Sequence, residues 1–383
     1  MPDANHRAGR YVRQLEGYSA FVPAPLPPDP PVNTDEEMLT LLSDADRALG
    51  RLDGSIQTLP DPDLFVFMYV RKEAVLSSQI EGTQSSLNDV LEAEAAITDP
   101  TRPRDVDEVL NYVDAMNFGL SRLHELPISV RLLREIHAHL LRNVRGAERQ
   151  PGELRTSQNW IGPSGATLLE ATFVPPPVHE LPKALSDFET FLHSEQSIPA
   201  LVRIGLAHAQ FETIHPFLDG NGRMGRLLIT FLLCERGTLS RPVLYLSYYF
   251  KRHRTQYYEL LQNVRDRGDW ESWLKFFLHG MAEVSREATE TARRIVDLRE
   301  SHRRLIVSEF GRSAGSALTV LEQLYSRPYL SINDVARIAN VTYPAASSLM
   351  GKFVQQGLLA ETTGNARNRR YGYAPYIAIF ASD

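Results

Sequence analysis

Residues 215–226 read His-Pro-Phe-Leu-Asp-Gly-Asn-Gly-Arg-Met-Gly-Arg and stand between two apolar segments, residues 200–214 and 227–234. The composition predicts a helix, then a Gly-rich turn, then a second helix. Glycines let backbone N–H groups approach an anion, and the N-terminus of the second helix adds unpaired donors and a positive dipole end. Arg223 and Arg226 are three residues apart, so they would share a helix face and can bind two phosphoryl groups. This stretch therefore predicts a polyphosphate site.

Two titratable side chains add chemistry to this predicted anion site. Asp219 would lie beside the phosphates, where a single carboxylate suits a Mg²⁺ ion that keeps most of its waters. His215 is the group in the stretch that can accept a proton near neutral pH. A base, a metal carboxylate and a phosphate site together indicate transfer from a nucleotide to a hydroxyl. The alternative is a structural Gly-rich turn with an incidental histidine, and no Walker loop is present elsewhere in the sequence.

The stretch resembles the signature of the Fic family, His-x-Phe-x-Asp/Glu-Gly-Asn-Gly-Arg-x-x-Arg, at every fixed position. The resemblance implies AMPylation, in which AMP moves from ATP to a Tyr, Ser or Thr hydroxyl of a protein, the chain itself included. It implies ATP as the substrate, His215 as the catalytic base and Asp219 as the Mg²⁺ ligand. A related kinase branch has a lysine where this chain has Gly222, which favours adenylyl over phosphoryl transfer. The nucleotide-binding residues that the resemblance implies are Gly220, Asn221, Gly222, Arg223, Met224, Gly225 and Arg226.

A second motif lies at the end of a helix expected to begin near residue 63. Residues 77–82 read Ser-Ser-Gln-Ile-Glu-Gly, and Gly82 is the expected helix terminator. Glu81 is unusual there, because an acid in the last turn opposes the helix dipole. The motif resembles the inhibitory Ser/Thr-x-x-x-Glu-Gly/Asn motif of Fic proteins, which implies that Glu81, with Ser77 one turn earlier, pairs with Arg226. Glu81 would then occupy the guanidinium that the γ-phosphate of ATP needs; the alternative is a solvated surface glutamate.

Two further segments have a structural and a functional interpretation. Residues 158–174 read as strand, turn and strand, and the Fic resemblance implies that Thr172, Phe173 and Val174 belong to a β-hairpin flap that pairs with the target backbone. A structural hairpin that covers the core is the alternative. The resemblance also implies that Tyr257 and Tyr258 line an adenine pocket, and the alternative is that both are packing aromatics.

The helix before the signature has a competing interpretation as a metal site. His208, Glu212 and His215 are spaced four and three residues apart, so they would lie on one helix face. The spacing differs from the His-Glu-x-x-His pattern of zinc hydrolases. We therefore expect His208 to be a core residue.

Length and composition are those of a soluble globular protein with two or three domains. The chain has 383 residues, is 43% hydrophobic and carries a net charge of −6, which gives no general attraction to nucleic acid or anionic lipid. No segment reads as a secretory signal or a membrane span, so we expect a cytoplasmic protein without membrane partners. The Pro-rich residues 18–33 suit an extended arm on a neighbouring surface.

The predicted fold is mainly α, with a Fic-type helical core, a β-hairpin flap and a C-terminal winged helix-turn-helix domain. Residues 313–383 suggest the last of these, with helices near 318–324, 331–339 and 343–356 and a strand at 371–373. The expected units are an N-terminal arm and first helix (1–60), an inhibitory region (61–100), a catalytic core (101–281), a connector helix (282–310) and the winged helix (311–383).

The predicted partner is a target protein that presents a hydroxyl side chain. The sequence also permits a homodimer, and DNA binding through Lys352, Arg367, Arg369 and Arg370 of the winged helix. The leading hypothesis is a self-restrained protein adenylyltransferase. The alternative is a DNA-binding regulator whose Fic core is inactive or only senses nucleotide.

Overall fold

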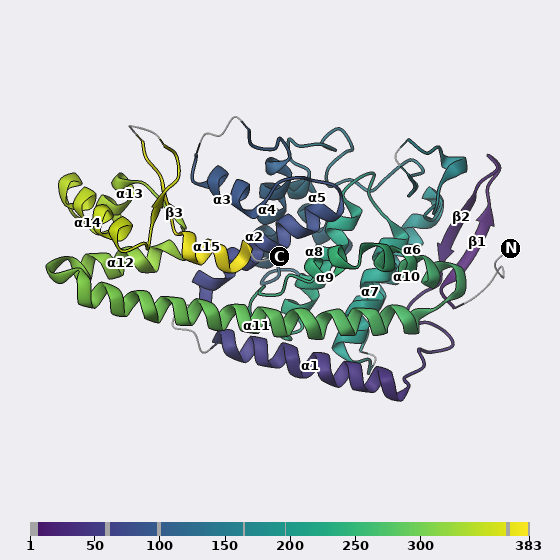
Figure 1. Ribbon diagram of the computed structural model, residues 1–383. Coiled ribbons are helices and arrows are strands. Elements are labelled where there is room, and N and C mark those ends of the chain that lie inside the picture. The colour runs from purple at the N-terminus through teal and green to yellow at the C-terminus, as the bar shows by residue number, and fades with distance from the viewer. Residues whose placement is uncertain are drawn as a thin grey trace.

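The computed structural model describes residues 7–57, 62–97, 101–163, 165–195, 197–364 and 368–381. Helices dominate the molecule and the strands are few and short, which confirms the predicted mainly α fold (Figure 1). Within these residues, no helix combines the length and the apolar character that crossing a bilayer requires.

One long helix connects the two ends of the molecule. Helix α11 (Trp270–Glu309) has 40 residues, and α1 (Glu36–Gln57) packs along it (Figure 1). Asp269 caps its start by accepting a hydrogen bond from the backbone N–H of Ser272. At about 1.5 Å per residue the helix spans roughly 60 Å. It runs unbroken through the boundary expected at residues 281/282, so the core and the connector share one helix.

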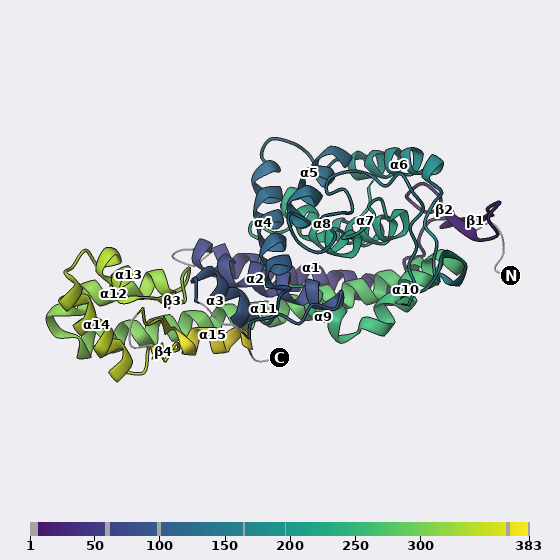
Figure 2. The same ribbon diagram turned by 90° about the horizontal axis from the view of Figure 1, so that it is seen from above.

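The centre of the core consists of helices α7 (Ala200–Ile214) and α8 (Asn221–Glu235), whose side chains are buried on almost every side. Such helices lie inside a bundle and not on its surface. The neighbouring helices surround them (Figure 2). They are α4 (Val106–Arg122), α5 (Val130–Leu140), α6 (Leu181–His193), α9 (Ser247–Arg252) and α10 (Arg254–Arg267).

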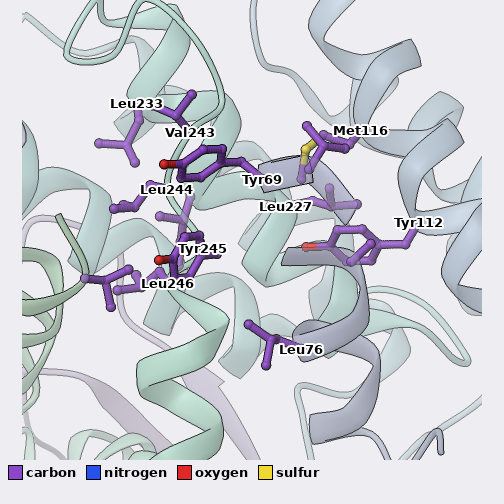
Figure 3. Close-up of a cluster of buried hydrophobic side chains, with 14 of the residues drawn as sticks. Tyr69, Leu76, Tyr112, Met116, Leu227, Leu233, Val243, Leu244, Tyr245 and Leu246 are labelled. Carbon is purple, nitrogen blue, oxygen red and sulfur yellow. The ribbon is translucent and has the colours of Figure 1, made fainter. Parts of the chain in front are cut away.

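Helix α2 (Pro62–Ile80) is the predicted helix that leads to Glu81, and a short helix α3 (Leu87–Glu94) follows it. Its Tyr69 and Leu76 belong to a buried cluster with side chains of α4, α8 and the segment 243–246 (Figure 3). Within this region, Glu73 accepts hydrogen bonds from Tyr112 Oη at 3.2 Å and from the backbone N–H of Ser247 at 3.1 Å. Burial raises the pKa of Glu73 to about 7 despite these donors. The polar contacts hold α2 in register against the core.

The N-terminal arm lies on the core, and it contains a hairpin that the sequence interpretation missed. Strands β1 (Gly9–Arg13) and β2 (Ser19–Pro23) pair antiparallel. The backbone N–H of Phe21 donates to the carbonyl of Val174 at 2.9 Å, and Gln210 Nε2 donates to the carbonyl of Ala24 at 2.8 Å. The arm is thereby attached both to α7 and to the segment that precedes α6.

The C-terminal unit contains the three helices and the strand expected from the sequence. Its sheet has the order β3-β5-β4, with both pairs antiparallel, and Ser331 forms a capping box with Asp334 at the start of α13. Helix α15 (Ala374–Ala381) was not expected. The winged-helix assignment stays an interpretation of this element order. The other elements are α12 (Ala314–Leu324), β3 (Tyr329–Leu330), α13 (Ile332–Ile338), α14 (Tyr343–Gln355), β4 (Ala360–Glu361) and β5 (Tyr371–Gly372).

The first half of α2 packs against this C-terminal unit. Phe65 stacks on Tyr325 with ring centroids 6.4 Å apart. Lys72 Nζ donates to the carbonyl of Phe380 at 3.1 Å, and the Phe380 ring lies edge-on to Tyr69 at 5.4 Å. One helix therefore contacts the C-terminal unit near its start and the core near its end.

The contact of α4 with α8 leaves no room for a side chain at Gly119. A Cβ there would lie 2.4 Å from Cζ of Phe231 and 3.0 Å from Cδ1 of Ile136. We expect Gly119→Ala to destabilise the fold by about 1–3 kcal/mol through overpacking, although alanine favours helix. Gly50→Ala is the matched control, because nothing lies within 4 Å of a Cβ there. Thermal melting should show a lower Tm for the first variant and an equal or higher Tm for the second; a Gly119 variant as stable as the control would refute the packing argument.

Candidate functional site

A cavity of about 720 Å³ gathers most of the predicted site residues from distant parts of the chain. Its walls are the end of α2, residues 160–162 and 172–173, the turn between α7 and α8, and α10. Of the predicted residues, it is lined by Glu81, Thr172, Phe173, His215, Asp219, Gly220, Asn221, Gly222, Arg223, Arg226, Tyr257 and Tyr258. Ser77, Val174, Met224 and Gly225 are not among the lining residues.

The turn between α7 and α8 requires two left-handed residues. His215 ends α7 with φ 50° and ψ 61°, and Gly220 precedes α8 with φ 74°. The side chain of Asn221 closes the loop: its Oδ1 accepts from the N–H of Phe217 at 2.9 Å and its Nδ2 donates to the Phe217 carbonyl at 2.8 Å. Asn221 therefore offers an anion its backbone N–H at the helix start, while its side chain has a structural role.

His215 is held through its backbone as well as its ring. Its carbonyl accepts from Arg155 Nε at 3.0 Å and from Asn159 Nδ2 at 3.1 Å. Ring atom Nδ1 lies 3.3 Å from the Glu212 carbonyl, and a carbonyl can only accept, so Nδ1 carries the proton and Nε2 is the free acceptor. Sequence reasoning missed Arg155 and Asn159, because their role arises only in the folded chain.

The electrostatic environment keeps the imidazole of His215 neutral. Burial is the largest cause, followed by the charge of Arg265, and together with Arg155 they lower the pKa of His215 to about 3. A neutral ring with a free Nε2 is the form that can accept a proton.

Asp219 stands at the mouth of the turn with its side chain 43% exposed. Its Oδ1 accepts from the N–H of Gly220 at 2.6 Å and lies 3.9 Å from an Arg223 nitrogen. Its backbone carbonyl accepts from Nε2 of His137, whose Nδ1 accepts from the N–H of Gly152 at 2.8 Å. Among the described residues, no three His, Cys, Asp or Glu side chains cluster as metal ligands. One exposed carboxylate beside a phosphate site nevertheless fits Mg²⁺, which takes its remaining ligands from phosphates and water.

The two arginines of α8 have different partners. Arg223, 3% exposed, lies 3.4 Å from the carboxylate of Glu108, which also binds Arg145 at 3.3 Å. Nε of Arg223 is buried and has no hydrogen-bond partner among the residues that the structure describes. Glu108 thus holds one guanidinium at the wall of the cavity and leaves part of it available to a ligand.

Arg226 is bound by Ser77 and Glu81, the pairing that the Fic resemblance implied. Its Nε donates to Ser77 Oγ at 2.8 Å, and its second terminal nitrogen donates to the Ser77 carbonyl at 3.0 Å and to Glu81 Oε1 at 2.7 Å. Desolvation opposes charge on Glu81, but Arg226 holds the pKa of this carboxyl below its usual value. A Cβ at position 222 would lie 2.3 Å from Glu81 Oε1, so the pair depends on Gly222.

The two tyrosines of α10 differ in their surroundings. Tyr257 is buried, and its hydroxyl donates to Nε2 of His208 at 2.8 Å, since Nδ1 of that histidine bonds the Gly225 carbonyl. His208 is therefore the core residue that the sequence predicted. Tyr258 is 37% exposed, with the guanidinium of Arg254 5.2 Å from its ring centroid. Both line the cavity, and their contact with adenine stays a prediction.

Two family models match this chain. Residues 39–121 match the model described as "Fic/DOC family N-terminal", and residues 127–233 match the model described as "Fic/DOC family". The chain therefore contains a Fic/DOC domain over these residues. The second match ends inside α8 and includes the whole signature of residues 215–226.

Curated relatives and solved structures agree with this assignment. Two relatives named protein adenylyltransferase Fic, from Drosophila grimshawi and Culex quinquefasciatus, are 32% and 33% identical to 51% of this chain. The chain spans only 38% and 37% of their lengths. A Fic family protein from Desulfovibrio desulfuricans G20 shares the fold, with a TM-score of 0.61 and 20% identity over 90% of this chain and 97% of that one. A Fic domain containing signaling protein from Bacteroides thetaiotaomicron has a TM-score of 0.52 and 16% identity over 65% of this chain and 95% of its own.

The hairpin expected over residues 158–174 is reduced to a single bridge, and its role as a flap stays a prediction. Ile161 and Phe173 form one antiparallel bridge, with N–H···O distances of 2.8 and 3.0 Å, in place of two strands. A capping box between Thr167 and Glu170 turns the chain into a 3₁₀ helix, η1 (Leu168–Glu170), where the second strand was expected. Phe173 and Val174 are buried, and the guanidinium of Arg265 lies 4.0 Å from the Phe173 ring centroid.

The basic residues suggested for DNA binding are largely engaged within the Fic protein itself. Lys352 donates to the Phe310 carbonyl at 2.9 Å and to Ser313 Oγ at 3.0 Å. Arg370 forms an ion pair with Asp334 at 3.1 Å. Arg367 lies outside the described residues. DNA binding through this unit stays a prediction.

The low pKa of His215 can be tested directly. Nitrogen-15 NMR of the histidine rings should show residue 215 neutral from pH 7 down to about pH 4, because its pKa lies near 3. Arg265→Met removes the second-largest cause and should raise that pKa toward the ordinary value. A wild-type titration midpoint near 6.5 would contradict the described environment.

Proposed function

We propose that this chain is a protein adenylyltransferase that transfers AMP from ATP to a hydroxyl side chain of a protein, and that Glu81 restrains it. The observation that carries the proposal is that His215, the N-terminus of α8, Arg223 and Arg226 line one cavity. The names of the curated relatives support the same activity.

The reaction needs a base and an anion site. Nε2 of His215 accepts the proton of the target hydroxyl, the hydroxyl oxygen bonds to the α-phosphorus, and pyrophosphate leaves as the bond between the α- and β-phosphates breaks. Backbone N–H groups at the start of α8 stabilise charge on the α-phosphate, and the two arginines bind the outer phosphates. Asp219 is the residue that would hold Mg²⁺, and the ion supplies neutralisation of phosphate charge.

The proposed restraint follows from the contacts of Arg226. Two of its nitrogens are bound by Ser77 and Glu81, and one guanidinium cannot bind Glu81 and a γ-phosphate in the same place. ATP would then bind with its phosphates displaced from in-line attack. Ser77 would remain bound to Arg226 when Glu81 leaves, so that the guanidinium stays positioned for the nucleotide.

The experiment uses the purified chain, Mg²⁺ and ATP labelled at the α-phosphate, with label on protein as the measurement. We expect Glu81→Gly to raise self-modification at least tenfold, because it frees Arg226. Adding His215→Ala to that variant should lower the rate by 10²–10⁴-fold, the contribution typical of general-base catalysis.

The outcomes separate the two hypotheses of the sequence analysis. Label that depends on His215 supports an enzyme. ATP binding without transfer, in the Glu81→Gly variant as well, would favour a regulator that senses nucleotide. Label unchanged or lowered by Glu81→Gly would refute the restraint but not the activity. The cytoplasmic location and the homodimer stay predictions.

A further inference from the structure

One buried carboxyl in the cavity has no role in the chemistry above. Glu212, on the last turn of α7, is 5% exposed and lines the cavity. Its Oε1 is buried and makes no hydrogen bond within the described protein. Buried acceptors without a partner are rare and destabilising, so this atom requires an explanation.

The position of the Glu212 carboxyl follows from two glycines of α8. A Cβ at Gly225 would lie 2.2 Å from Glu212 Oε1, and a Cβ at Gly222 would lie 2.3 Å from Glu81 Oε1. These glycines are three residues apart, so they share one helix face. The carboxyls of Glu81 and Glu212 therefore lie against one face of α8, and within the described residues only Glu81 forms an ion pair with Arg226.

The guanidinium of Arg265 lies near Glu212 but donates its hydrogen bonds to other atoms than the Glu212 carboxyl. Arg265 donates to the backbone carbonyl of Glu212 at 3.1 Å and to Thr213 Oγ1 at 3.2 Å. Burial raises the pKa of Glu212 to about 7, although Arg226 opposes the shift. The Glu212 carboxyl therefore occupies an unfavourable buried position, and its Oε1 is available to accept a hydrogen bond from a ligand.

The proposed position of the phosphates determines which part of a nucleotide would contact Glu212. With the phosphates at the N-terminus of α8, as the proposed function requires, the nucleoside lies along the rest of the cavity. The lining of the same cavity includes Tyr258, Leu261 and Gln262 from α10, and Glu212 from α7. A volume of about 720 Å³ is within the range usual for small-molecule sites.

We propose that Glu212 is a nucleoside-recognition residue, which accepts a hydrogen bond from a donor group of the bound nucleotide. The donor is either the exocyclic amine of the base or a ribose hydroxyl. This inference rests on the proposed function, because it takes the phosphate position from it. It assigns nucleotide selectivity to a residue outside the signature of residues 215–226.

The test measures equilibrium binding by calorimetry of ATP, 2′-deoxy-ATP and inosine triphosphate to the full chain carrying Glu81→Gly. Inosine triphosphate lacks the exocyclic amine, and 2′-deoxy-ATP lacks one ribose hydroxyl. We expect ATP to bind roughly 10–100-fold more tightly than one of the two analogues, as for loss of a hydrogen bond to a charged or polar partner. Weaker binding of inosine triphosphate identifies the amine, and weaker binding of 2′-deoxy-ATP identifies the hydroxyl.

Substitutions then assign the preference to Glu212. Glu212→Met has a similar volume without an acceptor and should remove the preference, while Glu212→Gln, which keeps a carbonyl oxygen, should retain much of it. Glu259→Gln is the matched control, since Glu259 is exposed on α10, outside the cavity lining. If Glu212→Met melts early, Glu212→Leu, which also lacks an acceptor, takes its place in the comparison. A preference that survives in a folded Met variant, or equal binding of all three nucleotides to the parent chain, overturns the inference. Absence of ATP binding in the parent chain overturns the proposed function as well.

Discussion

The structure of the site depends on the guanidinium of Arg226. It is the point at which α2 and α8, far apart in the sequence, are joined by hydrogen bonds. Its side chain is 1% exposed, so a charge is buried there, and such a charge is tolerated only when it is paired and hydrogen-bonded. Ser77 and Glu81 satisfy it, and Gly222 provides the space. The end of α2, the start of α8 and the shape of the cavity all follow from this requirement.

A second set of hydrogen bonds holds the turn between α7 and α8 in place. Asn221 closes the turn by bonding the backbone of Phe217, and Arg155 and Asn159 hold the carbonyl of His215. These bonds fix the left-handed residue that ends α7. The reactive ring is therefore positioned mainly through the backbone that carries it. Such positioning leaves the free ring nitrogen for chemistry.

The sequence predicted the local elements of this site better than its tertiary contacts. The pairing of Glu81 and Ser77 with Arg226 was implied by the resemblance of both motifs to those of Fic proteins, while the residues alone also allowed a solvated glutamate. The hairpin β1–β2 was missed, although residues 9–13 and 19–23 flank a turn with Gly17. The strand expected near residue 170 became a 3₁₀ helix, because the local capping box of Thr167 and Glu170 overrides the strand pattern. Glu212 stood in the sequence on one helical face with His208 and His215, but only the fold shows that its carboxyl lacks a partner.

Helix α2 makes contacts along its length with two different parts of the molecule. Phe65, Tyr69 and Lys72 contact the C-terminal unit, and Ser77, five residues after Lys72, contacts Arg226. The relative orientation of these two sets is determined by the number of residues between them. One residue inserted after Lys72 would rotate the second set by about 100° relative to the first. The number of residues between Lys72 and Ser77 is therefore constrained as well as the identity of the side chains that make these contacts.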